Sequence, residues 1–244
     1  MEFYPARFFT ASKSYNEWNR LSIKDVITLR TLAGLGFQQV YYYLNHPIQY
    51  VRVVGVVVDI EQFCEGKFTV LTIEDGSGES IEVRITARQG DDFAAPSNTT
   101  VDNVNAYVHL GLPLVKLNGC DVVVGSVVKV KATIRVFRKQ KQLELKRLFF
   151  VNDTAAEMKA WEETAAWKRD VLGKPWKLTR EEMREVDDKL RIEDERRFEK
   201  RKKTARYEQK LKERGLKKEQ KRAAQEREFD AGALPGSSRL PLPW

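Results

Sequence analysis

The residues best suited to bind a ligand lie in a basic segment that begins near residue 127. Side chains alternate between the two faces of a β-strand, so positions two residues apart share a face. One face of this segment, with the polar turn that follows, carries Lys129, Lys131, Arg135, Phe137, Arg138, Lys139 and Lys141. Cations can follow a phosphate chain and a ring can stack on a base, which predicts a single-stranded DNA site. The alternative is a solvated face, because exposed strands commonly carry Lys and Arg.

A second candidate strand adds two cations. In residues 79–88, Ile81 and Val83 share an apolar face, whereas Arg84 and Arg88 lie on the opposite, polar face. If the two strands are close in the folded sheet, these arginines extend the DNA site. Otherwise they are solvated side chains.

No catalytic or metal-binding pattern accompanies these residues. The two histidines, His46 and His109, have no patterned Ser, Cys or carboxylate near them. The Gly-Ser-Gly of residues 76–78 lacks the Gly-Lys-Ser/Thr that completes a phosphate loop, and it joins two strands as a hairpin turn does. Cys64 and Cys120 lack neighbours at metal-ligand spacing. The sequence therefore predicts that the protein is not an enzyme and uses no cofactor or metal.

An apolar stripe at helical spacing follows the basic segment. It comprises Met158, Trp161, Ala165 and Leu172, with Trp167 on another side of the same helix. Thr154 and Glu157 have the spacing of a capping box, and Gly173 ends the pattern. Tryptophan is enriched at interface hot spots, so this stripe predicts an interface with a partner helix. The alternative is that the helix covers the chain's own domain.

These candidate sites must be positioned by a mainly β domain. Residues 50–60, 67–75, 79–88, 127–137 and 143–151 read as strands separated by turn residues. Gly55 lies in the middle of the first strand, where a bend or bulge leaves no room for a side chain. Five strands with a long connection between the third and fourth predict a five-stranded OB-fold barrel. Within that connection, residues 104–115 could form a short strand or a helix.

The barrel has α-helical extensions on both sides. The predicted organisation is an N-terminal extension that packs on the barrel (1–45), the OB fold (46–153), its C-terminal helix (154–173) and a charged tail (174–244). Ser22 with Asp25 opens a helical pattern over residues 21–31, and Thr179 with Glu182 forms a capping box in the tail. Because apolar residues in the tail are sparse, it is either a long solvated helix or disordered.

Charge and cysteine content restrict the setting of the protein. The 244 residues carry a formal net charge of +8, and most of the excess lies beyond residue 153. A nearly neutral barrel must bind nucleic acid through a local cluster of cations. Two cysteines are too few for a secreted disulfide framework. With no long apolar stretch and no signal-peptide pattern, we expect a soluble, intracellular protein without membrane contacts.

Several segments resemble one known family. FYPARFF near the N-terminus, NHPIQYVRVVGVVV at the first strand, IEDGSG in the first hairpin and VKVKATIRVFRKQKQLELKRL in the second are similar to the Stn subunit of the CST telomere-capping complex of filamentous fungi. The resemblance covers about residues 3–172, and NHPIQYVRVVGVVV leading into IEDGSG is its most specific part. The family is itself similar to the middle subunit of replication protein A.

The resemblance implies a subunit that binds single-stranded telomeric DNA with the small OB-fold subunit Ten, in the nucleus at the telomeric region of the chromosome. It also implies contacts with the large CST subunit and with DNA polymerase alpha. Many relatives carry winged-helix domains after the barrel, where this chain has a charged run over 181–228, so the functions of those domains stay open. The alternatives are a general single-stranded DNA-binding subunit and a purely architectural OB-fold subunit.

Overall fold

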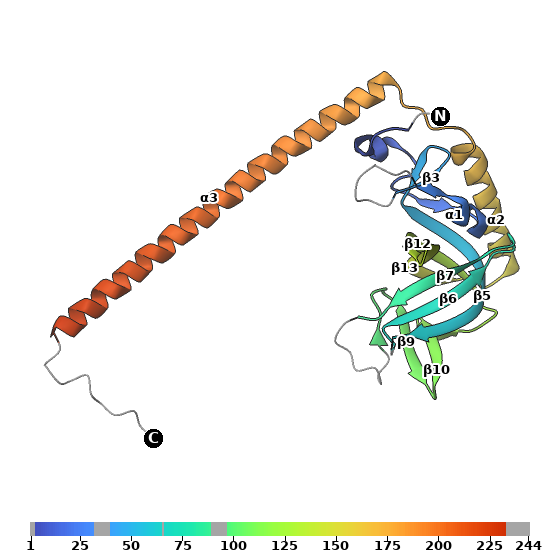
Figure 1. Cartoon of the computed structure of the whole chain (residues 1–244), viewed down its shortest axis with the longest axis horizontal. Helices are drawn as coiled ribbons and strands as arrows, with labels where there is room; N and C mark the ends of the chain where they lie inside the picture. The colour runs from blue at the N-terminus through green and yellow to red at the C-terminus, as the bar shows by residue number, and fades with distance from the viewer. Residues whose placement is uncertain (1–2, 32–39, 65, 89–96, 233–244) are drawn as a thin grey trace. The chain divides into compact units, whose positions relative to one another are not determined.

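The structure is a computed structural model, and it describes residues 3–31, 40–64, 66–88 and 97–232. The chain forms two compact units, Met1–Met183 and Arg184–Trp244. Figure 1 follows the chain from short N-terminal elements through a curved sheet to a single long helix. All candidate site residues belong to the first unit.

The core of the first unit is a closed, curved sheet. Its strands are β5 (Tyr50–Phe63), β6 (Phe68–Glu74), β7 (Ser80–Thr86), β12 (Val127–Phe137) and β13 (Gln140–Phe150), with the short β1 (Trp18–Arg20) beside β5. The order is β1-β5-β12-β13-β7-β6, and a β5–β6 pairing closes the barrel. Alternate side chains point inward, so that Ile81, Val83 and Ile85 of β7 are buried. The predicted OB-fold barrel with helical extensions is confirmed; β1, which pairs in parallel with β5, adds a strand.

The longest strand, β5, serves both halves of the barrel. Its first half pairs with β12 and its second half with β6, with a register shift between Val57 and Asp59. Gly55 lies where the pairing changes, and a Cβ atom there would be 2.4 Å from the carbonyl oxygen of Glu74. Glycine at this position is therefore required by close backbone approach. The sequence predicted a bend or bulge there, whereas the register shift lies further along the strand.

Small elements precede the barrel. They are η1 (Ala6–Ala11), α1 (Ile23–Thr28), β2 (Arg30–Thr31), β3 (Tyr41–Tyr43) and β4 (His46–Ile48). Ser22 caps α1, since its hydroxyl accepts a hydrogen bond from Asp25 N at 3.2 Å. The helix is shorter than predicted and ends at Thr28, because residues 30–31 pair with β3 and their backbone groups are used in that ladder.

The connection between the third and fourth barrel strands forms a sheet of its own. It contains β8 (Ser97–Asn98), β9 (Val104–His109), β10 (Leu112–Leu117) and β11 (Cys120–Val122), in the order β11-β10-β9-β8. Val104, Val115 and Leu117 from it are buried in the main hydrophobic core. Of the two possibilities for residues 104–115, strand is therefore the correct one, whereas residues 89–96 lie outside the described part of the chain.

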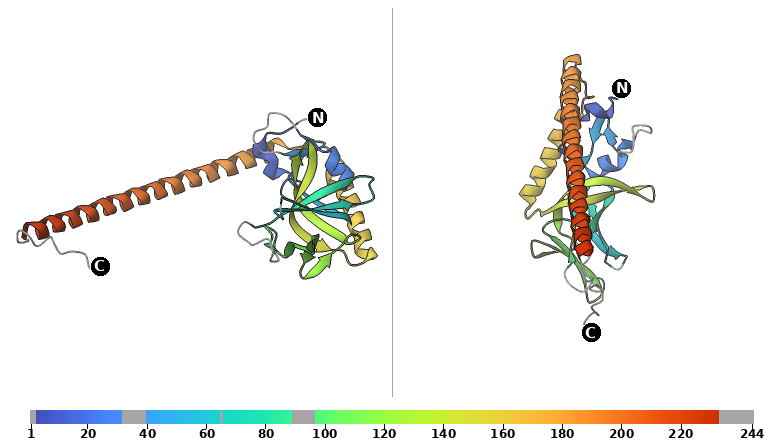
Figure 2. Two further views of the ribbon diagram at one scale, coloured as in Figure 1. Left: turned by 60° about the horizontal axis from the view of Figure 1, so that its bottom comes forward. Right: turned by 90° about the vertical axis from the view of Figure 1, so that its left-hand side faces the viewer.

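Helices follow the barrel. α2 (Thr154–Trp167) continues into the π-helical turn η2 (Lys168–Leu172), and α3 spans Arg180–Gly232. The predicted cap at Thr154 is wrong by one residue, because the Asp153 carboxylate accepts from Ala156 N at 2.6 Å. The capping box at Thr179 is confirmed: Glu182 accepts from Thr179 N at 2.8 Å and donates its own N–H to Thr179 at 3.2 Å. Figure 2 shows α3 as one continuous helix of 53 residues.

Candidate nucleic-acid interface

A groove of about 400 Å³ lies on the outward face of the barrel between the β5–β6 and β12–β13 hairpins. The β5–β6 hairpin contributes Phe63, Cys64, Phe68 and Val70, β7 contributes Glu82 and Arg84, and the β12–β13 hairpin contributes Phe137, Arg138, Gln140 and Gln142. Phe63 and Phe137, one from each hairpin, are 48% and 50% exposed. Bare aromatic rings in a groove with cations are what a single strand needs for base stacking and phosphate contact.

Two arginines of this groove lie against its rings. The guanidinium carbon of Arg84 is 4.6 Å from the Phe68 ring centroid, and that of Arg138 is 5.2 Å from the Phe137 centroid. A guanidinium stacked on a ring keeps its in-plane donors available for phosphate. The sequence analysis missed Phe63 and Phe68. Strand alternation could have found Phe68, which shares a side of β6 with Val70.

The turn of the β12–β13 hairpin is shorter than the polar run suggests. Arg138 and Lys139 have φ angles of 47° and 69°, as in a two-residue primed turn, and Lys139 is exposed.

Arg135, on the strand before this turn, forms an ion pair with Glu144, which also accepts from Lys146 at 3.1 Å. Arg135 is therefore a neutralised member of the predicted DNA set.

Lys141 faces away from this groove, contrary to its predicted place in the DNA site. Its ammonium donates to the carbonyl oxygens of Val26, Ile27 and Leu29 at 3.2, 2.5 and 2.6 Å. These carbonyls end helix α1, where backbone acceptors lack helical partners. Burial lowers the pKa of Lys141. The lysine thus caps a helix of the N-terminal extension, a contact across more than a hundred residues that no local pattern reveals.

The remaining predicted cations lie elsewhere. Lys129 and Lys131 are near the opposite end of β12 from Phe137, with Phe149 and Arg147 as their respective partners across the ladder. Arg88 is exposed just beyond β7. The structure therefore divides the predicted DNA set, bringing Arg84, Phe137 and Arg138 into the groove and leaving Lys129, Lys131 and Arg88 outside it.

The residues of the predicted partner stripe divide between an exposed face and a buried face of the α2–η2 segment. Met158 and Trp161 are 58% and 49% exposed, and Ala165 is exposed beside them. Trp167 and Leu172 are 8% and 0% exposed and belong to the main core. Their assignment to a partner interface is wrong. A π-helical turn has more residues per turn than an α-helix, so η2 rotates Leu172 away from the outer stripe.

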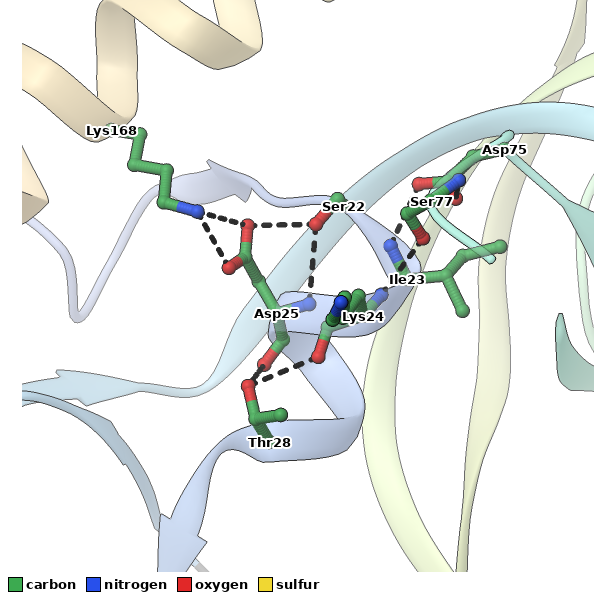
Figure 3. A network of polar contacts seen from close by, with 8 residues as sticks. All are labelled: Ser22, Ile23, Lys24, Asp25, Thr28, Asp75, Ser77 and Lys168. Atoms are coloured by element: carbon green, nitrogen blue, oxygen red, sulfur yellow. Dashed lines mark hydrogen bonds and ion pairs between the residues drawn. The ribbon is translucent and has the colours of Figure 1, made fainter. Parts of the chain in front are cut away.

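A hollow of about 410 Å³ adjoins this outer face, with Trp161, Ala165 and Lys168 on one side and the β6–β7 turn on the other. Its base is fixed by a polar network (Figure 3), in which Lys168 Nζ donates to Asp25 Oδ1 at 2.7 Å and Ile23 N donates to Asp75 Oδ2 at 2.7 Å. The bond to Asp25 raises the pKa of Lys168. The helix, α1 and the β6–β7 turn are thereby held together.

The histidines have structural surroundings. His46 is buried, its Nε2 lies 2.7 Å from the carbonyl oxygen of Lys174, and burial lowers its pKa. His109 is exposed at the end of β9. Within the described ranges, no group of three His, Cys, Asp or Glu side chains could hold a metal ion. Among the helices that the structure describes, none is long and apolar enough to cross a membrane.

The comparisons with known proteins agree with this architecture. A family model described as telomere regulation protein Stn1 matches residues 1–230. The chain belongs to the Stn1 family. This membership confirms the predicted family and makes the chain a non-enzymatic OB-fold protein of telomere regulation. No curated protein sequence matches the chain significantly.

Three solved structures are similar to this Stn1 family member, and one of them has a TM-score above 0.5. A chain in the crystal structure of yeast Stn1 and Ten1 is 18% identical, with a TM-score of 0.54 over 76% of this chain and 90% of that one. A chain of the S. pombe Stn1–Ten1 complex is 22% identical, with a TM-score of 0.48, and covers 65% of this chain and 96% of its own length. A chain of a replication protein A heterotrimer bound to single-stranded DNA is 15% identical, with a TM-score of 0.45 and coverages of 64% and 98%.

Proposed function

We propose that this chain is a telomere-capping subunit that holds single-stranded telomeric DNA in the groove between the β5–β6 and β12–β13 hairpins. The observation that carries the proposal is that the half-exposed rings Phe63 and Phe137 share one groove with two ring-stacked arginines. Arg84 lies over Phe68 and Arg138 lies over Phe137. Stacked bases and paired phosphates then hold the strand without chemical turnover. As a telomere protein, it acts in the nucleus at chromosome ends.

A small OB-fold partner of the Ten1 type is part of this proposal. The outer face of α2 offers Met158 and Trp161 beside the hollow against the β6–β7 turn. A large aromatic side chain with an adjoining hollow is the arrangement of an interface hot spot. The partner would contact this face, and binding of DNA by the pair would be tighter than by the chain alone. The large CST subunit and DNA polymerase alpha are further partners in this proposal, and their binding is to be tested separately.

The DNA proposal is tested by fluorescence anisotropy with a labelled single-stranded telomeric oligonucleotide, using the chain alone and with its partner. Phe137→Ala should weaken binding by about 1–3 kcal/mol and leave the salt dependence nearly unchanged, since a stacking contact releases no counterion. Arg138→Ala should lower the slope of log affinity against log salt by about 0.7.

Leu112→Ala is the matched control, because this side chain is 66% exposed on β10 and lies outside the groove lining. Parent-like binding by both groove variants in the partner complex would contradict the proposal and favour a purely architectural subunit. Chromatin mapping separates the remaining alternative, because signal spread along chromosome arms indicates a general single-stranded DNA-binding subunit.

A further inference from the structure

A second concentration of cations lies at the other end of the outward face of β12. Here a hollow of about 290 Å³ is lined by Arg20, Arg52, Lys129 and Lys131, together with Trp18 and Glu17. Three strands meet there, because β5 pairs with β1 on one side and with β12 on the other. We name these lining residues the basic hollow.

Positive charge in the basic hollow exceeds what the chain itself neutralises. Arg52 donates to the Glu163 carboxylate at 2.5 Å, and Arg20 Nε lies 3.7 Å from the same carboxylate. In the described part of the chain, no ion pair neutralises Lys129 or Lys131. Burial, and then the neighbouring cations on β13, β12, β5 and β1, lower the pKa of Lys131. An anion in the hollow would relieve this repulsion.

Unpartnered donors add a second, independent sign of a ligand. The Nε atoms of Arg20 and Arg52 are buried and have no hydrogen-bond partner among the described residues. Arg52 as a whole is only 8% exposed; its Nη1 donates to Glu163 and its Nη2 donates to the Ala160 carbonyl oxygen. Buried donors are nearly always satisfied in folded proteins, so each of these two arginines has one donor that an additional acceptor would satisfy.

Aromatic rings between these cations indicate which anion fits. Lys129 Nζ is 5.2 Å from the Phe149 ring centroid, and Lys131 Nζ is 5.6 Å from the Trp18 centroid. Phe149 is 36% exposed. Cations interleaved with rings suit a nucleic-acid strand, which presents phosphates and stackable bases together, better than an acidic peptide, which presents only carboxylates.

The basic hollow is separate from the groove. Lys131 and Phe137 are six residues apart on one strand face, a distance of roughly 20 Å at about 3.4 Å per residue. Between them Arg135 and Lys146 both pair with Glu144, so one carboxylate offsets one of these two positive charges. The two DNA-type surfaces therefore lie at the ends of one strand ladder, with ion-paired cations between them.

We infer that the basic hollow is a second contact for single-stranded DNA, which takes the sugar–phosphate backbone of a strand that extends out of the groove. This inference rests on the proposed function, because a strand must first be held in the groove. It predicts that the contact is used by long strands and not by short ones.

The test compares labelled oligothymidines of about 6 and about 24 nucleotides, the second exceeding the roughly 4–16 nucleotides that one OB fold occupies. The full-length chain carries Lys129→Gln with Lys131→Gln. Binding of the long strand should weaken about tenfold or more at 50 mM salt, and its salt slope should fall by about 1.4 for two lost phosphate contacts. Binding of the short strand should not change.

Lys24→Gln with Lys177→Gln removes the same charge from two exposed lysines outside both surfaces and should leave both affinities at the parent value. Arg147→Gln, an exposed change next to Lys131, should give a smaller loss for the long strand and guards against misfolding of the double variant. The second contact is overturned if the Lys129→Gln/Lys131→Gln variant and the Arg147→Gln variant both bind the long strand like the parent. It is also overturned if the two strand lengths lose equal affinity. A parent chain that binds neither strand, alone or with its partner, overturns the groove proposal as well.

Discussion

The two faces of α2 carry similar residues, but one face is buried in the core and the other is exposed. Trp167 on the inner face is 8% exposed and packs in the core, whereas Trp161 on the outer face is 49% exposed. The ion pair between Arg52 and Glu163 also holds the inner face to the barrel. On the outer face Met158 is 58% exposed. The same helix therefore buries one tryptophan in the core and leaves another exposed, so residue type alone does not show which side of a helix is buried.

The largest expected effect is on the buried side of α2 and of its continuation η2, where Leu172 lies. Leu172→Ala should lower the free energy of unfolding by about 2–5 kcal/mol, because the side chain is fully buried and its loss leaves a cavity. Urea denaturation followed by tryptophan fluorescence measures this change. A loss below about 1 kcal/mol would mean that α2 is not held to the barrel in this way.

The outer face should respond in binding instead. Trp161→Ala should weaken association with a Ten1-type partner by about 2 kcal/mol or more, as expected for a tryptophan hot spot, with the melting temperature near that of the parent. Isothermal titration calorimetry and thermal denaturation of the same sample give both values. Unchanged partner affinity with a lower melting temperature would remove the distinction between the two faces.

Two lysines of the β12–β13 hairpin give a similar contrast on a smaller scale. Lys141→Ala should destabilise the chain by about 1–3 kcal/mol, since it removes a charged donor from three carbonyl oxygens at the end of α1. Lys139→Ala, two residues away and exposed, is the matched control and should be neutral in stability. Equal melting temperatures for the two variants would show that Lys141 does not cap α1 in solution.

The smallest effect concerns the inner-face ion pair. The hydrogen bond from Arg52 lowers the pKa of Glu163, so the folded state favours the carboxylate. The resulting stability is present above the unfolded pKa of about 4.3 and is lost as pH falls through the lower folded pKa. Because Glu163 is 39% exposed, solvent screens the pair. Glu163→Gln should be slightly less stable than the parent at pH 7, and urea denaturation should show the difference shrinking toward pH 3.

Much of the fold could be predicted from the sequence, because it follows from local rules. Strand alternation identified the barrel strands, and Gly55 was correctly predicted to be a position with no room for a side chain. Capping residues located the starts of α1 and α3 at Ser22 and Thr179. Each of these signals depends on residues a few positions apart, which is the range over which sequence patterns are read.

The candidate site could be predicted only in part, because its contacts are long-range. Lys141 reaches the end of a helix in the N-terminal extension, and Phe63 becomes part of the groove only when the two hairpins face each other. The placement of Leu172 depends on a π-helical turn, and the α-helical spacing of the stripe does not predict such a turn. In each case three-dimensional packing decided the role of a residue whose type had been read correctly.

Helix α3 has a mechanical consequence. At about 1.5 Å per residue its 53 residues measure roughly 80 Å from end to end, whereas a flexible chain of that length would average roughly 40 Å between its ends. Charge pairs one turn apart, such as Glu185 with Lys189 at 3.9 Å and Asp188 with Arg191 at 3.5 Å, support it without a packed face. The helical form thus keeps the two ends of this segment several nanometres apart, about twice as far as a flexible chain of the same length would.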